Sequence, residues 1–267
     1  TVNYLDLNNS AEAVIESGAQ INQNVDYRTY SLQSVTVEAD ILLQLVNVAG
    51  LFDFDLPEST DSDLALPGAI GSDGGKEGFG GSALVVFISN NATALIEEGV
   101  LLNAGSEGVV RVKAGSRTEN FTFAQSGNSA KKLAIGGTFS LNKQENITQA
   151  QIESGAYISG GSLIIFADDQ TSHINIAGSI MKGNSTGIGT SIAINEINRE
   201  VLAGVGSPDL SLIFTDPSTT DIVLIGDLDI DARAEGSIYT FSLASTSITK
   251  GPKEKTKQTS DKTQNAP

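Results

Sequence analysis

The stretch Val35-Thr36-Val37-Glu38-Ala39 places an apolar residue at every second position. The same pattern recurs three more times, as Val110, Val112 and Ala114; as Leu163, Ile165 and Ala167; and as Leu228, Ile230 and Ala232. Alternation with a period of two is typical of a β-strand that buries one of its faces. Recurrence along the chain indicates stacked units, each of which buries its apolar face only against its neighbours.

A second repeated stretch precedes the first three copies. It reads Ile15-Glu16-Ser17-Gly18, then Ile96-Glu97-Glu98-Gly99, then Ile152-Glu153-Ser154-Gly155. The copies are unequally spaced along the chain. A core unit of about fifty residues, with loops inserted at its corners, explains this spacing. Each unit is expected to form about two coils of a solenoid.

Two all-β architectures accommodate such repeats. Tandem sandwiches need about 100 residues and seven strands per unit, with a bulky aromatic anchor in each core. This chain has 6% aromatic residues and no Trp. A parallel β-helix (β-solenoid) with corner loop insertions is therefore the favoured fold class, with Val37, Val112, Ile165 and Ile230 pointing into its core.

The chain is interpreted as one solenoid segment over residues 1–249, followed by a disordered tail rich in Lys and Thr over 250–267. The largest insertion, 53–78, is acidic and contains Gly and Pro, so a protruding corner loop is expected there. Net charge is −16 for the whole chain. Such an acidic body argues against nucleic acid as a partner, and no apolar run is long enough to insert into a membrane as a helix.

Residues with catalytic or metal-binding potential are few. Without Cys the chain has no disulfide or thiolate site, and His173 is its one histidine, interpreted as an outward strand residue. Acidic groups occur at Asp227, Asp229 and Asp231, and at Asp168-Asp169. They are interpreted as solvated faces. We predict no catalytic, cofactor-binding or metal-binding residues.

Two further sets of residues are candidates for cation binding or glycosylation. Calcium at the acidic loop is a weaker alternative, with Asp53, Asp55, Asp61 and Asp63 as oxygen ligands, because no recognised calcium loop motif is present. Sequons of the N-x-[ST] type occur at Asn91, Asn120, Asn146 and Asn184. Their number is close to what the composition alone gives.

Three Gly-rich stretches carry a family resemblance. The stretch from Gly187 to Asn198 reads GIGTSIAINEIN, and related copies begin at Gly80-Gly81 and Gly136-Gly137. They resemble the repeats of filamentous-haemagglutinin-like adhesins and leukotoxin-type exoproteins, which are very large bacterial secreted surface proteins. The resemblance implies a right-handed parallel β-helix, an extracellular or bacterial cell-surface location, and a stalk or adhesive role.

We therefore expect a structural or adhesive segment of a large bacterial surface or secreted protein, with no catalysis. Its partners would be a receptor or glycan on a host or neighbouring cell and the flanking repeats of its parent chain, and exposed end coils could associate end to end. The alternative is a β-helical carbohydrate-active enzyme or carbohydrate-binding domain. An enzyme should gather Asp or Glu with Lys, Arg or Tyr on one sheet, whereas a stalk should spread them.

Overall fold

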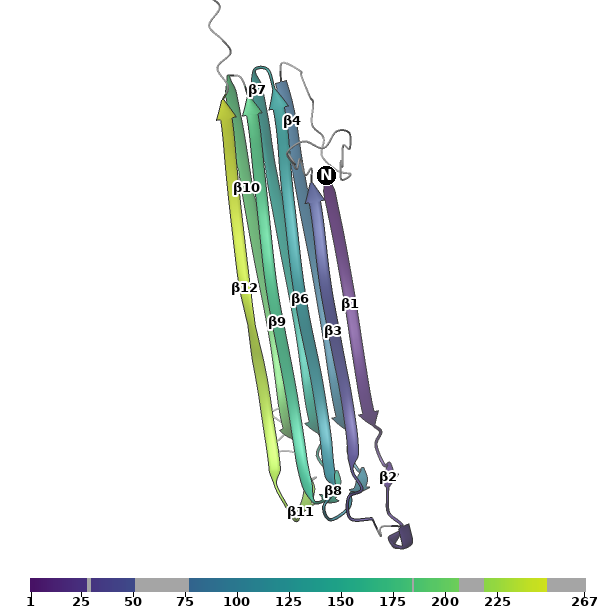
Figure 1. The fold of residues 1–267 in the computed structure, drawn as a ribbon. Helices are drawn as coiled ribbons and strands as arrows, with labels where there is room; N and C mark the ends of the chain where they lie inside the picture. The colour runs from purple at the N-terminus through teal and green to yellow at the C-terminus, as the bar shows by residue number, and fades with distance from the viewer. Residues whose placement is uncertain (28–29, 51–76, 184, 207–218, 249–267) are drawn as a thin grey trace, which may run out of the picture.

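The fold was analysed in a computed structural model that describes residues 1–27, 30–50, 77–183, 185–206 and 219–248. The chain winds through four coils, and each coil consists of a long strand, a short strand and a second long strand (Figure 1). The described residues form twelve strands. Coil 1 contains β1 (Val2–Ile15), β2 (Gln20–Ile21) and β3 (Val35–Gly50), and coil 2 contains β4 (Glu77–Ile96), β5 (Leu101–Asn103) and β6 (Val109–Ala130). Coil 3 contains β7 (Leu133–Ile152), β8 (Tyr157–Gly160) and β9 (Ser162–Gly183), and coil 4 contains β10 (Thr186–Val205), β11 (Asp221–Leu224) and β12 (Leu228–Ile248). A short 3-10 helix covers Val25–Tyr27.

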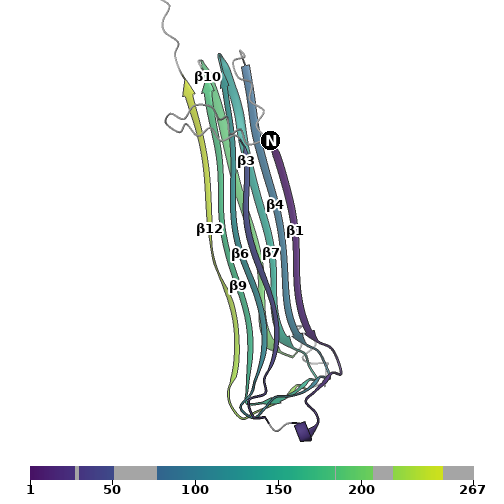
Figure 2. The ribbon, with the colours of Figure 1, turned by 45° about the vertical axis from the view of Figure 1, so that its right-hand side comes forward.

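The strands form three parallel sheets of four. Sheet A has the order β1-β4-β7-β10, sheet B the order β11-β8-β5-β2, and sheet C the order β12-β9-β6-β3. Figure 2 shows sheets A and C as two facing walls of a thin, elongated molecule, joined at one end by the short strands of sheet B. This is a right-handed parallel β-helix, as expected.

The repeated stretches stack in register, which explains why they recur. Ala39, Ala114, Ala167 and Ala232 form one column across sheet C. In the neighbouring column, Val37, Val112 and Ile165 are buried, as predicted. Ile230 continues that column but is 44% exposed, because β12 is the outermost strand of sheet C. Its predicted inward position is confirmed by the register, but it is not buried in the core.

The glycine-ending stretches form the turns between the first long strand and the short strand. Gly18, Gly99 and Gly155 have φ angles of +74°, +67° and +80°. Glycine adopts this left-handed conformation at little cost, whereas other residues do so with strain. Gly206, with φ of +96°, directly follows β10, two residues earlier in the register than these three glycines.

The expectation of about two coils per repeat is wrong, because each repeat makes one coil. The long strands contain 14 to 22 residues. The repeated V-x-V-x-A pattern marks only the first residues of the strands of sheet C. Beyond these residues β6, β9 and β12 continue with segments that contain Ser, Thr and Gly, and β3 continues with Leu, Val, Gln and Asn. The repeat did not identify these segments as strand.

The interior between the two walls has an apolar part and a polar part. Close to sheet B lies a cluster of aliphatic side chains that includes Ile96, Leu102, Ile152, Ile158, Leu163 and Ile165. Farther along coils 2 and 3 the buried side chains are largely polar, among them Asn90, Thr118, Thr122, Ser140, Asn142, Gln144, Asn146 and Asn175. The polar interior leaves apolar residues of the same strands on the outer faces.

The expected acidic loop at 53–78 lies outside the described residues, except for Glu77 and Gly78, which begin β4. The expected tail at 250–267 also lies outside them. Residues Asp53, Asp55, Asp61 and Asp63, considered for calcium, fall in the same undescribed segment.

Candidate functional site

The outer face of sheet C carries a dense group of charged residues together with Gln170, here called the charged band. It comprises Glu38, Asp40, Arg111, Lys113, Arg117, Glu119, Asp168, Gln170, Asp229, Asp231, Arg233 and Glu235, at outward positions of all four strands. In-register stacking brings residues from four coils together, because each coil adds one strand to the same wall. The band thus combines acidic and basic groups on one surface.

Ion pairs within the band hold several of these side chains in place. Lys113 Nζ lies 2.7 Å from Glu38 Oε1, and Arg117 Nη2 lies 2.7 Å from Glu119 Oε1. Arg233 pairs with Asp231 on the outermost strand, at 2.5 Å. These pairs are exposed and each stabilises the fold only slightly. Their main effect is to present donors and acceptors in fixed positions.

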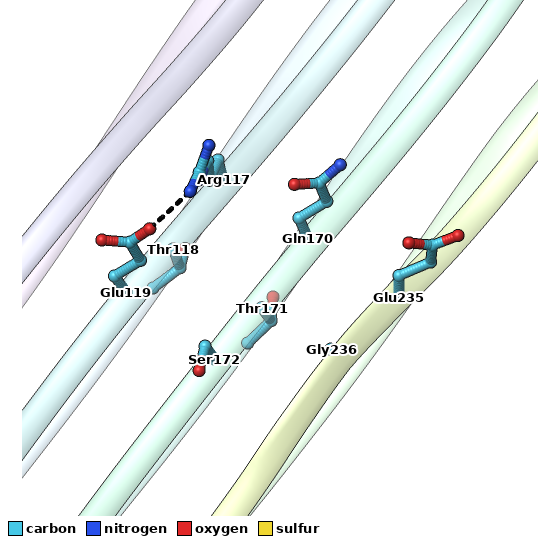
Figure 3. Close-up of a pocket in the computed structure, with 8 residues that line it drawn as sticks. All are labelled: Arg117, Thr118, Glu119, Gln170, Thr171, Ser172, Glu235 and Gly236. Carbon is cyan, nitrogen blue, oxygen red and sulfur yellow. Dashed lines mark hydrogen bonds and ion pairs between the residues drawn. The ribbon is translucent and has the colours of Figure 1, made fainter.

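A hollow of about 200 Å³ crosses the band. Figure 3 shows the side chains of Arg117, Glu119, Gln170 and Glu235 standing at its rim, from three adjacent strands. Gly236, which continues the column of Thr118 and Thr171 onto the outermost strand, also lines the hollow. Thr118 and Thr171 also contribute to the hollow, although both are buried residues.

An apolar surface, here called the platform, adjoins the charged band along the same strands. Its first column is Val46, Phe121, Ile174 and Tyr239, and its second is Val48, Phe123, Ile176 and Phe241. Phe241 is 54% exposed and Val46 is 74% exposed. A second hollow, of about 410 Å³, includes Glu119 and Ser172 of the first hollow and also Phe121 and Ile174 of the platform. Band and platform therefore form one continuous surface.

The electrostatics of the band suit binding better than proton transfer. The hydrogen bond and charge of Lys113 lower the pKa of Glu38. A hydrogen bond from Arg117 likewise lowers the pKa of Glu119. Burial, with the nearby charge of Glu38, raises the pKa of Asp40. Carboxylates whose pKa is lowered remain ionised at neutral pH, so Glu38 and Glu119 are poor general acids.

The interior contains a ladder of asparagines that ends in an ion pair. Asn9 Nδ2 donates to Asn90 Oδ1 at 2.8 Å, and Asn90 Nδ2 donates to Asn146 Oδ1 at 3.1 Å. Asn146 Nδ2 then donates to Asp169 Oδ2 at 2.6 Å. Arg199, which follows Asn146 in the ladder column, lies 3.3 Å from Asp169 Oδ1. Hydrogen bonds satisfy these buried polar groups, and the ladder links all four coils.

His173 is buried, and the prediction that it points outward is wrong. It is 1% exposed, and its Nε2 lies 2.5 Å from Gln144 Oε1. Burial lowers the pKa of His173 to about 4, so it is neutral at neutral pH. The misassignment arose because its neighbours Ile174 and Ile176, which the alternation rule would bury, lie on the outer platform instead.

The structure separates the acidic residues that the sequence grouped together. Asp168 belongs to the charged band, whereas Asp169 is fully buried, so the interpretation of both as a solvated face is wrong for Asp169. Asp229 and Asp231 lie at alternate positions of β12, and Asp227 immediately precedes that strand. Among the described residues, no group of three or more His, Cys, Asp and Glu could hold a metal ion.

Two of the sequons considered above are inaccessible in the folded chain. Asn120 and Asn146 are 3% and 2% exposed, so neither could carry a glycan. Asn91 lies exposed on β4, and Asn184 is outside the described residues. Sequence reasoning missed the platform altogether. Its signal is the repeated alternation Phe121-Thr122-Phe123, Ile174-Asn175-Ile176 and Tyr239-Thr240-Phe241, read with the apolar residues facing out.

Comparisons with known proteins identify no relative. No family model matches the chain, and neither a curated protein nor a solved structure matches it. Within the described part of the chain, no helix is long and apolar enough to cross a membrane.

Proposed function

We propose that this chain is a structural and adhesive segment of a large bacterial cell-surface or secreted protein, without catalysis, and that the outer face of sheet C is its contact surface. One observation carries the proposal: a wall of four long parallel strands presents the charged band beside the platform. Exposed apolar patches rimmed by polar groups are typical of surfaces that bind other macromolecules.

The rigid scaffold supports this role. Neighbouring long strands pair along their length, which fixes the spacing of outward side chains. A contact surface built on strands loses little conformational entropy on binding. Its partner would be a protein or glycan on another cell surface, recognised by Arg, Glu and Gln side chains together with the aromatic rings of the platform.

A carbohydrate-binding or carbohydrate-active domain is the second candidate, and one observation favours it. The band gathers acidic with basic residues on a single sheet, and Tyr239 lies in the adjoining platform. Aromatic rings beside polar side chains also suit sugar recognition. Catalysis would require a carboxyl able to donate a proton. Ion pairing holds Glu38 and Glu119 in the ionised form, whereas burial raises the pKa of Asp40, which makes Asp40 the better proton donor of the three.

Binding to arrays of neutral and anionic glycans, and to intact cells, tests the proposal. Replacing Tyr239 and Phe241 by Ser should reduce cell or glycan binding by roughly tenfold or more, since each ring supplies a large apolar contact. The matched control is Ile192→Ser, a similarly exposed apolar residue on sheet A. Equal loss with the control would contradict the assignment of the contact surface.

Turnover assays separate the two candidates. Incubation with pectic, alginate or glycosaminoglycan substrates should release no unsaturated or reducing ends. Release that is abolished by Asp229→Asn or Asp168→Asn would instead establish the carbohydrate-active enzyme, because both residues lie in the charged band.

A further inference from the structure

The two ends of the solenoid present unpaired strands. Within the described chain, β1, β2 and β3 of coil 1 have strand neighbours on one side only, and so do β10, β11 and β12 of coil 4. Free backbone donors and acceptors along such edges can pair with another strand. The two ends differ in sequence, so the relevant question is whether one end fits the other.

The core columns continue from one end to the other with matching side chains. At coil 4, Val205 ends the column that begins with Ile15, and Ile222 ends the column that begins with Ile21. Both members of each pair are only partly buried, at opposite ends of the same apolar cluster. A second copy stacked in register on coil 4 would place Ile15 beside Val205 and Ile21 beside Ile222.

The asparagine ladder is complementary across such a junction. Each amide donates its Nδ2 towards the next coil, so the ladder begins with the acceptor oxygen of Asn9. It ends with Arg199, whose guanidinium has only donors. Asn9 of an added copy would follow Arg199 in this column. Its oxygen could then accept a charge-assisted hydrogen bond from the guanidinium.

One column on the outer face of sheet C would also bring opposite charges together at the junction. Asp40, Gly115, Asp168 and Arg233 form one column, so Asp40 of an added copy would lie beside Arg233. Nearby, Glu38 would follow Asp231, but each already has a basic partner in its own chain, Lys113 and Arg233 respectively. Burial raises the pKa of the Asp40 carboxyl, and a cation beside it would lower that pKa again.

From these matches we infer that copies of this chain stack head to tail, with coil 1 of one copy adding to coil 4 of another in the register of the internal coils. The junction repeats the coil-to-coil contact that the chain makes three times internally. Because the two surfaces differ, the association does not close into a dimer and grows into filaments. This inference is independent of the proposed adhesive function.

Sedimentation velocity of the full chain, from low micromolar to near-millimolar concentration, tests the inference. The average mass should rise continuously with concentration. Asp40→Arg and Arg233→Asp should each weaken association by roughly tenfold, because each places like charges at the junction. Mixing the two variants in equal amounts, or combining both changes in one chain, should restore it, because the junctions then again contain opposite charges.

Control variants carry equivalent charge reversals at positions away from the junction. Arg117→Asp lies on β6 and Glu145→Arg on β7, both in inner coils, and neither should alter association. Circular dichroism checks that all variants are folded. A chain that remains monomeric near millimolar concentration overturns the inference, as does assembly that stops at a dimer. Single variants that associate like wild type, or a mixture that fails to recover, also overturn it.

Discussion

The buried carboxylate of Asp169 in β9 lies 3.3 Å from the guanidinium of Arg199 in β10, on the opposite wall of the solenoid. Asp169 is fully buried, whereas the Arg199 side chain is 29% exposed. The carboxylate also accepts hydrogen bonds from Asn146 at 2.6 Å and from Thr171 at 2.9 Å. This cluster joins sheets A and C in a region where aliphatic packing is sparse.

Arg199→Ala should therefore destabilise the fold. Removal of the guanidinium leaves a buried charge with only neutral hydrogen-bond partners, which should lower the free energy of unfolding by about 2 kcal/mol. Partial exposure of Arg199 keeps this below the value for a fully buried pair. Urea denaturation measures the change. Glu200→Ala, on the outward position of the same strand, is the control and should have almost no effect.

Addition of Asp169→Asn to Arg199→Ala should recover part of the lost unfolding free energy. Both members of the ion pair are then absent, so no unpaired charge stays buried. If the double variant is as unstable as the sum of the two single variants, the residues do not interact as described.

Acid should destabilise the chain through His173. Its pKa lies at about 4 in the folded protein against an ordinary value of 6.5, so the unfolded chain binds the proton more readily between these values. Stability is complete above the unfolded pKa and falls as the pH drops from 6.5 towards 4, by about 3 kcal/mol. Urea midpoints across this range should show the loss. His173→Gln should flatten this part of the profile, and an unchanged profile would contradict the assignment.

The alternation in this sequence predicted the strands and their stacking, but not which face is buried. Val110 and Val112 are buried, as the apolar rule requires. Farther along the same strand Thr122 is buried between outward Phe121 and Phe123. Hydrogen bonding between Thr122 and Asn175 of the next strand satisfies the buried polar groups, a pairing that becomes visible only when the coils are aligned.

The number of coils was mispredicted for a related reason. The stretches ending at Gly99 and Gly155 were recognised as a repeat, and the structure places them in stacked turns. Strand length was underestimated, because the polar continuation from Ser116 to Ala130 resembles loop sequence in its Ser, Thr, Asn and Gly content. For the same reason the platform, and with it the candidate contact surface, could not be predicted.

Gly99→Ala should lower stability by about 1 kcal/mol, because Gly99 has φ of +67° and alanine is strained in this conformation. The cost is purely conformational, since the nearest atom to an added methyl group would be 3.8 Å away. Gly204→Ala is a matched control in β10, where nothing lies within 4 Å and the backbone is not left-handed. Thermal unfolding compares them. Equal effects of the two changes would show that the turn does not require glycine.

Ile165→Asp should be the most damaging of these changes. Ile165 is fully buried in the apolar cluster near sheet B, in the column with Val112 and Val37. A carboxylate there would have no cationic partner, and its desolvation together with the lost packing should cost several kcal/mol, about a third or more of the stability of a typical domain. Chemical denaturation and circular dichroism measure the loss.

The adjacent residue provides the control for this prediction. Ile164 lies at an outward position of β9, between Arg111 of β6 and Asp229 of β12 in its column. Ile164→Asp keeps the same chemical change one residue away and should alter the unfolding free energy by less than about 1 kcal/mol. Comparable losses for both variants would mean that the two faces of β9 are not distinguished as described, and the assignment of its inner face would then be wrong.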